Sequence, residues 1–152
     1  MPGLKAELIA VCGMNCNVCS NYLALVNDTK SKGVKLPYCK GCRPRDKKCA
    51  FLKKKCGEKL LNNEVEFCYE CNMFPCELIE KLGKGYEEKY RMNMVDNLKY
   101  IKENGLDSFL EAEREKWRCP TCGDVICCHN GICYNCGLEK LRNKKKKYRW
   151  ED

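Results

Sequence analysis

The chain is poor in the residues that most catalytic metal sites and most large cores require. Among its 152 residues there are one histidine, four phenylalanines and two tryptophans. Catalytic zinc typically takes two or three His or carboxylate ligands and keeps one open position, which a chain with one His is badly equipped to provide. Because large aromatic residues are scarce, the core must be small. We therefore expect that burial of apolar residues alone does not hold the fold together.

Long apolar runs and several familiar catalytic motifs are also missing. No segment approaches the roughly 20 apolar residues of a membrane span, and Met1 to Ala10 carries Lys5 and Glu7 in place of a secretory apolar stretch. We therefore expect a cytoplasmic protein with no membrane partner. No phosphate-binding glycine loop, GxSxG elbow or His-based metal triad is present, so we expect a protein that is not an enzyme of the ordinary kinds.

The chain is instead rich in cysteine. Of its sixteen cysteines, ten lie between Cys12 and Cys76 and six between Cys119 and Cys136. In the cytosol thiols are kept reduced, so cysteines clustered at short spacing indicate metal ligands rather than disulfides. A structural zinc site contributes about 10 to 16 kcal/mol of apparent folding free energy. We therefore predict that metal organises the cysteine-rich parts.

The most specific motif is a pair of CxxC sequences near the C-terminus. Cys119 and Cys122 form the first pair, and Cys133 and Cys136 follow after ten intervening residues. Two such turns place four thiolates around one ion, which predicts a zinc ribbon with residues 129–131 as the turn of a short hairpin. Rubredoxin-type iron uses the same ligands and is the alternative. We interpret the adjacent Cys127 and Cys128 as non-ligands and His129 as a turn residue.

The N-terminal cysteines allow several groupings. We predict one four-thiolate zinc site from Cys16, Cys19, Cys39 and Cys42 and another from Cys49, Cys56, Cys68 and Cys71, with Cys12 and Cys76 unassigned. With the ribbon this makes about three zinc ions. The CxxxCxxC triplet that begins at Cys12 is also the spacing that holds iron-sulfur clusters, so an iron-sulfur cluster is the alternative here. A radical enzyme of that type needs a barrel of about 200 residues, which this chain lacks.

The rest of the chain is predicted to be helical. A short helix starts near Cys16 with Cys19 in its first turn, and another runs from Cys76 to Leu82 and stops at Gly83. Further helices are expected from Met94 to Asn104 and from a Ser108 capping box onward. The predicted fold is small, metal-stabilised and mainly α with little β. Its expected segments are a cysteine-rich metal-binding region (1–82), a helical connecting segment (83–117), a zinc ribbon (118–138) and a basic tail (139–152).

Several of these motifs together resemble one family. They are Cys12-Gly-Met-Asn-Cys16-Asn-Val-Cys19, Cys39-Lys-Gly-Cys42, Glu66-Phe-Cys68-Tyr-Glu-Cys71-Asn-Met-Phe-Pro-Cys76, and Trp117-Arg-Cys119-Pro-Thr-Cys122. The chain is similar, over roughly Ile9 to Gly137, to uncharacterised bacterial and archaeal cysteine-rich proteins grouped as a domain of unknown function. The resemblance implies a small helical zinc-binding protein that ends in a zinc ribbon. It implies no reaction.

The charge of the chain suggests its partners. Seven of the 29 basic residues lie between Leu138 and Asp152, within a net charge of +8. Such a run is typical of a solvated tail, or of a surface that binds phosphates, with Tyr148 and Trp150 able to stack on bases. We expect a non-catalytic zinc protein that acts as an adaptor or nucleic-acid-binding module, with a protein as the other possible partner. The alternatives are an iron-sulfur redox protein, or a thiol- or sulfur-transfer enzyme that uses Cys76 or Cys12.

Overall fold

Helices account for most of the regular structure. The computed structural model describes residues 3–44 and 66–151, and these contain five α-helices and four short 3-10 turns. They form no strand, only three isolated β-bridges. The predicted mainly α fold with little β is therefore confirmed for the described residues. The elements are α1 (Ser20–Val26), α4 (Glu77–Tyr90), α5 (Met94–Asn104), α6 (Leu106–Lys116), α7 (Leu138–Asn143), η1 (Ala6–Leu8), η2 (Cys16–Val18), η3 (Thr29–Lys32) and η4 (Cys68–Glu70).

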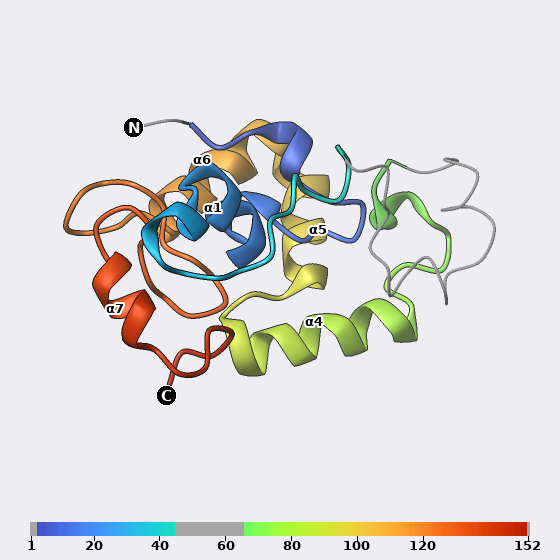
Figure 1. Ribbon diagram of the computed structural model, residues 1–152. Coiled ribbons are helices and arrows are strands. Elements are labelled where there is room, and N and C mark those ends of the chain that lie inside the picture. Colours follow the sequence, from blue (N-terminus) through green and yellow to red (C-terminus); the bar gives the residue numbers. More distant parts are fainter. Residues whose placement is uncertain (1–2, 45–65, 152) are drawn as a thin grey trace.

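Helices α4, α5 and α6 follow one another and pack in that order (Figure 1). Asn93 begins α5 as its N-cap, because its side-chain oxygen accepts hydrogen bonds from the backbone N–H groups of Val95 and Asp96. The buried face of α5 carries Met94, Val95, Asn97, Leu98 and Ile101. As predicted, this helix ends at Asn104, before Gly105.

The loop that carries the first cysteines packs directly on α5. The side chain of Asn97 donates a hydrogen bond to the carbonyl of Gly13 at 2.9 Å. Gly13 has φ +88°, and a Cβ added there would meet Leu98 Cγ at 2.8 Å. Only glycine allows this close approach, which fixes Cys12 and Cys16 against the helix core.

Three predicted helix boundaries are wrong. Gly83 does not stop α4, which continues to Tyr90; a Cβ at Gly83 would lie 2.5 Å from Asn93 Oδ1, so glycine lets the two helices approach closely. Helix α6 begins at Leu106 after Gly105, and no Ser108 capping box starts it. Near Cys16 the chain forms η2, and α1 begins only at Ser20 with Cys19 as its N-cap.

The C-terminal cysteine-rich segment packs against η2 and the start of α1. The N–H of Cys128 donates to the carbonyl of Val18 at 2.9 Å. The hydroxyls of Ser20 and Tyr134 lie 2.6 Å apart, and Tyr134 is fully buried. Parts of the chain more than 100 residues apart therefore share one core.

The basic tail is folded onto the body and does not extend into solvent. The ammonium of Lys147 donates to the carbonyls of Leu141, Arg142 and Lys144, which end α7. The indole N–H of Trp150 donates to the carbonyl of Cys128 at 2.8 Å. Lys147 and Trp150 therefore pack within the fold. Five of the seven basic side chains of the tail are nevertheless exposed, in agreement with a solvated charge run: Lys140, Arg142, Lys145, Lys146 and Arg149. None of the helices in the described ranges has the length and apolar character needed to cross a membrane.

Candidate metal centres

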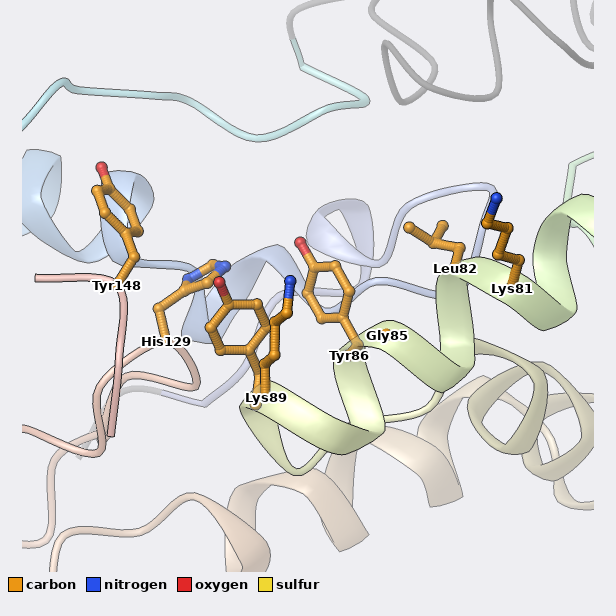
Figure 2. A pocket seen from close by; sticks show the side chains of 8 residues that line it. Lys81, Leu82, Gly85, Tyr86, Lys89, His129 and Tyr148 are labelled. Carbon is orange, nitrogen blue, oxygen red and sulfur yellow. The ribbon is translucent and has the colours of Figure 1, made fainter. Parts of the chain in front are cut away.

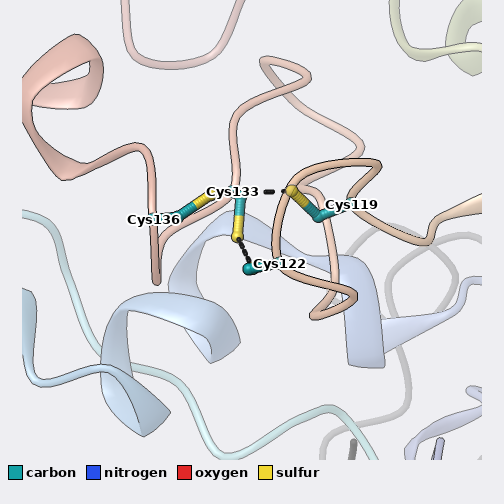
Figure 3. Close-up of side chains that lie close together, drawn as sticks. All are labelled: Cys119, Cys122, Cys133 and Cys136. Carbon is teal, nitrogen blue, oxygen red and sulfur yellow. Dashed lines mark hydrogen bonds between the residues drawn. The ribbon is translucent and has the colours of Figure 1, made fainter.

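Four cysteine sulfurs meet at the C-terminal site. Those of Cys119, Cys122, Cys133 and Cys136 all lie within 4.8 Å of one another, and the side chains turn toward a common centre (Figure 3). The Cys119–Cys136 and Cys122–Cys133 sulfurs are each 3.6 Å apart. A tetrahedron with metal–sulfur bonds of about 2.3 Å has sulfur–sulfur edges of about 3.8 Å. The four thiols can therefore hold one metal ion.

The backbone N–H groups at this site and the closeness of its four sulfurs both favour a bound cation. The backbone N–H groups of Cys122 and Thr121 donate to the Cys119 sulfur and lower its pKa to about 6. Hydrogen bonding to Cys119 and Cys122 raises the pKa of Cys136 to about 12. Sulfurs this close cannot all ionise unless a cation lies between them. The arrangement is a closed four-thiolate site, with no open position for a substrate.

The segment between the two CxxC pairs is a turn without regular strands. Two isolated bridges, Arg118 with Val125 and Ile126 with Cys133, take the place of the expected hairpin. Its turn is closed by the N–H of Gly131, which donates to the carbonyl of Cys127 at 2.8 Å. The thiols of Cys127 and Cys128 are fully buried and lie outside the four-sulfur group; burial raises the pKa of both.

A second group of thiols lines a cavity in the N-terminal part. The cavity measures about 130 Å³, and its walls include Met14, Tyr22, Leu82, Tyr86 and Met94. Its five cysteines are Cys12, Cys16, Cys19, Cys39 and Cys42. The cavity therefore contains the four cysteines predicted to form one site, together with the unassigned Cys12.

Short local structures position these thiols. Cys12 and Cys16 lie on the loop fixed by Gly13, and Cys19 is the N-cap residue of α1, although its sulfur makes no capping hydrogen bond. The N–H of Gly41 donates to the Cys39 sulfur at 3.4 Å. A hydrogen bond with Cys42 and burial raise the pKa of Cys16, and burial raises that of Cys19. Without a cation both thiols stay protonated.

The two thiol groups differ in spacing. Among the described residues, the ribbon is the one set of three or more metal-ligating side chains whose donor atoms all lie within 4.8 Å of one another. No three of the cavity thiols meet that condition. The cavity thiols instead surround a space of about 130 Å³, several times the roughly 30 Å³ that one water occupies in the liquid.

The other predicted ligands are more scattered. Cys68 is the first residue of η4 and Cys71 follows its end, and the N–H of Cys68 donates to the carbonyl of Val11 at 2.9 Å. Cys76 is the N-cap of α4, which begins at Glu77, and is not inside the helix as predicted. Cys49 and Cys56 lie outside the described residues, so their site with Cys68 and Cys71 stays a prediction.

A pocket of about 420 Å³, which was not predicted from the sequence, lies beside the thiol cavity. Its lining includes Tyr86, Tyr90 and Lys89 from α4, together with His129 and Tyr148 (Figure 2). The spacing of Tyr86 and Tyr90 by one helical turn was a signal for a shared face. Nothing in the sequence indicated that His129 would lie opposite them.

Comparison with known families supports the N-terminal part of the resemblance. Residues 8–81 match the family described as "Protein of unknown function (DUF3795)". The resemblance to an uncharacterised cysteine-rich family is thereby confirmed over that segment, which contains all ten N-terminal cysteines. The ribbon lies beyond the matched residues, so the match is shorter than the predicted likeness to Gly137. Comparisons with curated proteins and with solved structures found no significant match.

Proposed function

We propose that this chain is an iron-sulfur protein with a separate structural zinc ribbon, and that its role is electron transfer through a cluster in the N-terminal cavity. The observation that carries the proposal is the different spacing of the two thiol groups. The ribbon sulfurs lie as close together as the ligands of a single ion. Two of the cavity thiols, Cys16 and Cys42, are joined by a hydrogen bond, but no three of the five lie that close, and all five line an open space.

This difference follows from how each centre binds thiolates. All four ligands of a zinc ion share one metal, so their sulfurs must nearly touch. The ligands of an iron-sulfur cluster bind different iron atoms, so their sulfurs stand further apart around the cluster. The sulfur spacing of the ribbon, which suits one ion, gives a reference within the same structure for the sulfur spacing of the cavity.

The composition of the cavity supports the same conclusion. Three of its cysteines, Cys12, Cys16 and Cys19, have the CxxxCxxC spacing, and Cys39 and Cys42 supply two more thiols. Leu82, Met94, Tyr22 and Tyr86 add apolar and aromatic side chains to the wall. Burial and hydrogen bonds to sulfur are the means by which a protein sets the potential of a cluster.

Metal analysis of protein purified without oxygen tests the proposal. We expect one zinc and several irons per chain, with a brown chromophore that dithionite bleaches. Cys19→Ser should lower the iron content and leave the zinc, whereas Cys122→Ser should lower the zinc and leave the iron. Zinc in both sites, without iron or colour after anaerobic reconstitution with iron and sulfide, would overturn the proposal in favour of a purely structural zinc protein.

A nucleic-acid or protein partner for the basic tail stays a prediction. The tail residues Lys147, Tyr148 and Trp150 form intramolecular hydrogen bonds, to α7, Asn21 and Cys128 respectively. Stacking of Trp150 on a base would require it to leave the Arg91 guanidinium, which lies 3.9 Å from the indole ring centre.

A further inference from the structure

The pocket along α4 is separate from both metal centres. At about 420 Å³ it falls in the size range of small-molecule sites. Lys81, Tyr86 and Lys89 line it along one face of α4, and His129 and Tyr148 lie across from the end of that helix (Figure 2). Three tyrosines and a histidine make most of its wall aromatic.

His129 is held in a fixed orientation in this wall. The N–H of Ser20 donates to its Nδ1 at 3.2 Å, so in the neutral ring the proton is on Nε2. The ring centres of Tyr90, Tyr148 and Tyr86 lie 4.7, 5.7 and 6.0 Å away in edge-to-face arrangements. Burial lowers the pKa of His129 to about 4, so the ring is uncharged at neutral pH. Such a wall fits the flat face or edge of a planar ring.

The charged residues of the pocket have one sign. Lys81 and Lys89 line it, and none of the acidic side chains in residues 3–44 and 66–151 does. They lie eight residues apart on α4, which is about 12 Å along the helix axis. The acidic residues Glu88 and Glu151 line a neighbouring cavity, on the far side of Tyr90 and Tyr148. The pocket therefore favours an anionic group on the ligand.

Gly85 keeps space open in the pocket. It lies inside α4, where glycine weakens a helix, yet a Cβ added there would meet no atom within 4 Å. Packing accounts for Gly83, two residues earlier, but not for Gly85. An unfilled position in the lining is the feature expected where a ligand occupies the space.

The pocket also adjoins the thiol cavity. Leu82 and Tyr86 line both spaces, so one layer of side chains separates them. From these observations, we propose that the α4 pocket binds a small planar aromatic molecule with an anionic carboxylate or phosphate group, next to the cysteine cavity. The inference does not depend on which metal occupies that cavity.

Three probes with the same ring test this proposal on the full, metal-loaded chain. They are 2-naphthoate, 2-naphthyl phosphate and the neutral 2-naphthol, with affinities measured by calorimetry. We expect at least one anion to bind about tenfold or more tightly than 2-naphthol, and the tighter anion identifies the head group. Because the chain has one histidine, its ring NMR signals report His129 alone, and we expect them to shift on binding.

Variants of α4 show whether the probe is in the pocket. Gly85→Leu should fill it and abolish binding, while the thermal unfolding midpoint stays the same or rises. Lys89→Gln should weaken the anion several-fold, whereas Lys84→Gln, the same change at an exposed position outside the pocket, should not. Equal affinity for 2-naphthol, unshifted His129 signals, or full binding by Gly85→Leu would overturn the proposal. None of these results depends on iron in the cavity, so the proposed cluster can fail independently.

Discussion

Two glycines in the same helix should respond in opposite ways to alanine. Gly83 and Gly85 both lie within α4, and alanine is favoured over glycine in a helix interior by about 1 kcal/mol. At Gly85 a Cβ meets nothing within 4 Å, so Gly85→Ala should raise the free energy of unfolding by about 0.5 to 1 kcal/mol. The gain comes from helix propensity alone.

At Gly83 the same change disturbs the start of the next helix. The added Cβ would lie 2.5 Å from Asn93 Oδ1 and 3.3 Å from the backbone nitrogen of Met94. Asn93 Oδ1 accepts the N–H bonds that cap α5, and loss of such a cap costs about 1 kcal/mol. Overpacking adds about 1 to 3 kcal/mol. After the gain in helix propensity, Gly83→Ala should be destabilised by about 1 to 3 kcal/mol.

Urea unfolding of the metal-loaded variants, followed by far-UV circular dichroism, measures both effects. Metal content should be checked first, so that each variant is compared in the same loaded state. The free energies of unfolding of the two variants should differ by about 1.5 to 4 kcal/mol, with similar urea slopes. If Gly83→Ala were as stable as the natural chain, the close contact between α4 and the Asn93 cap would be wrong.

Three further predictions concern buried or capping groups. Burial lowers the pKa of His129 from 6.5 to about 4. The stability due to its neutral ring is therefore complete above about pH 6.5, and up to about 3 kcal/mol of it is lost as the pH falls toward 4. In parallel urea titrations, His129→Gln should lose less stability over that pH range than the natural chain. Burial raises the pKa of Glu113, which accepts hydrogen bonds from two buried donors. At pH 7 Glu113→Gln should therefore be at least as stable as the natural chain, whereas Glu113→Ala should lose about 1 to 3 kcal/mol of unfolding free energy. Equal stability of the two variants would contradict this. Lys147→Met removes the ammonium that caps α7 and should lower the thermal midpoint, while Lys146→Met should not; a matched drop in both would assign the effect to charge alone.

The parts of the fold that follow from local patterns were predictable. The period of Met94, Leu98 and Ile101 fixed the bounds of α5, because one apolar face and a terminal Asn-Gly are local signals. The paired CxxC motifs likewise identified the four cysteines that the structure brings together. Both signals depend on residues close in sequence.

Features that depend on distant partners were not predictable. Gly83 looks like a helix stop until Asn93 is known to lie against it. Lys147 and Trp150 look like a free basic tail until the ends of α7 and the Cys128 carbonyl are placed beside them. His129 sits beside Tyr90 and Tyr148 only because the ribbon packs on α1 and the tail returns over it. In each case tertiary contacts override a sound local inference.

The boundary of the matched family segment bears on where function lies in this chain. The match ends at residue 81, inside α4, yet Leu82, Tyr86 and Met94 complete the wall of the thiol cavity. Leu82 and Tyr86 also line the α4 pocket. Asn97 and Glu113, further along the chain, hold the loop of the first cysteines through Gly13 and Asn15. A fragment that stopped at residue 81 would therefore keep the N-terminal thiols and lose part of the surface that encloses them, so the thiol cavity requires residues beyond the matched family segment.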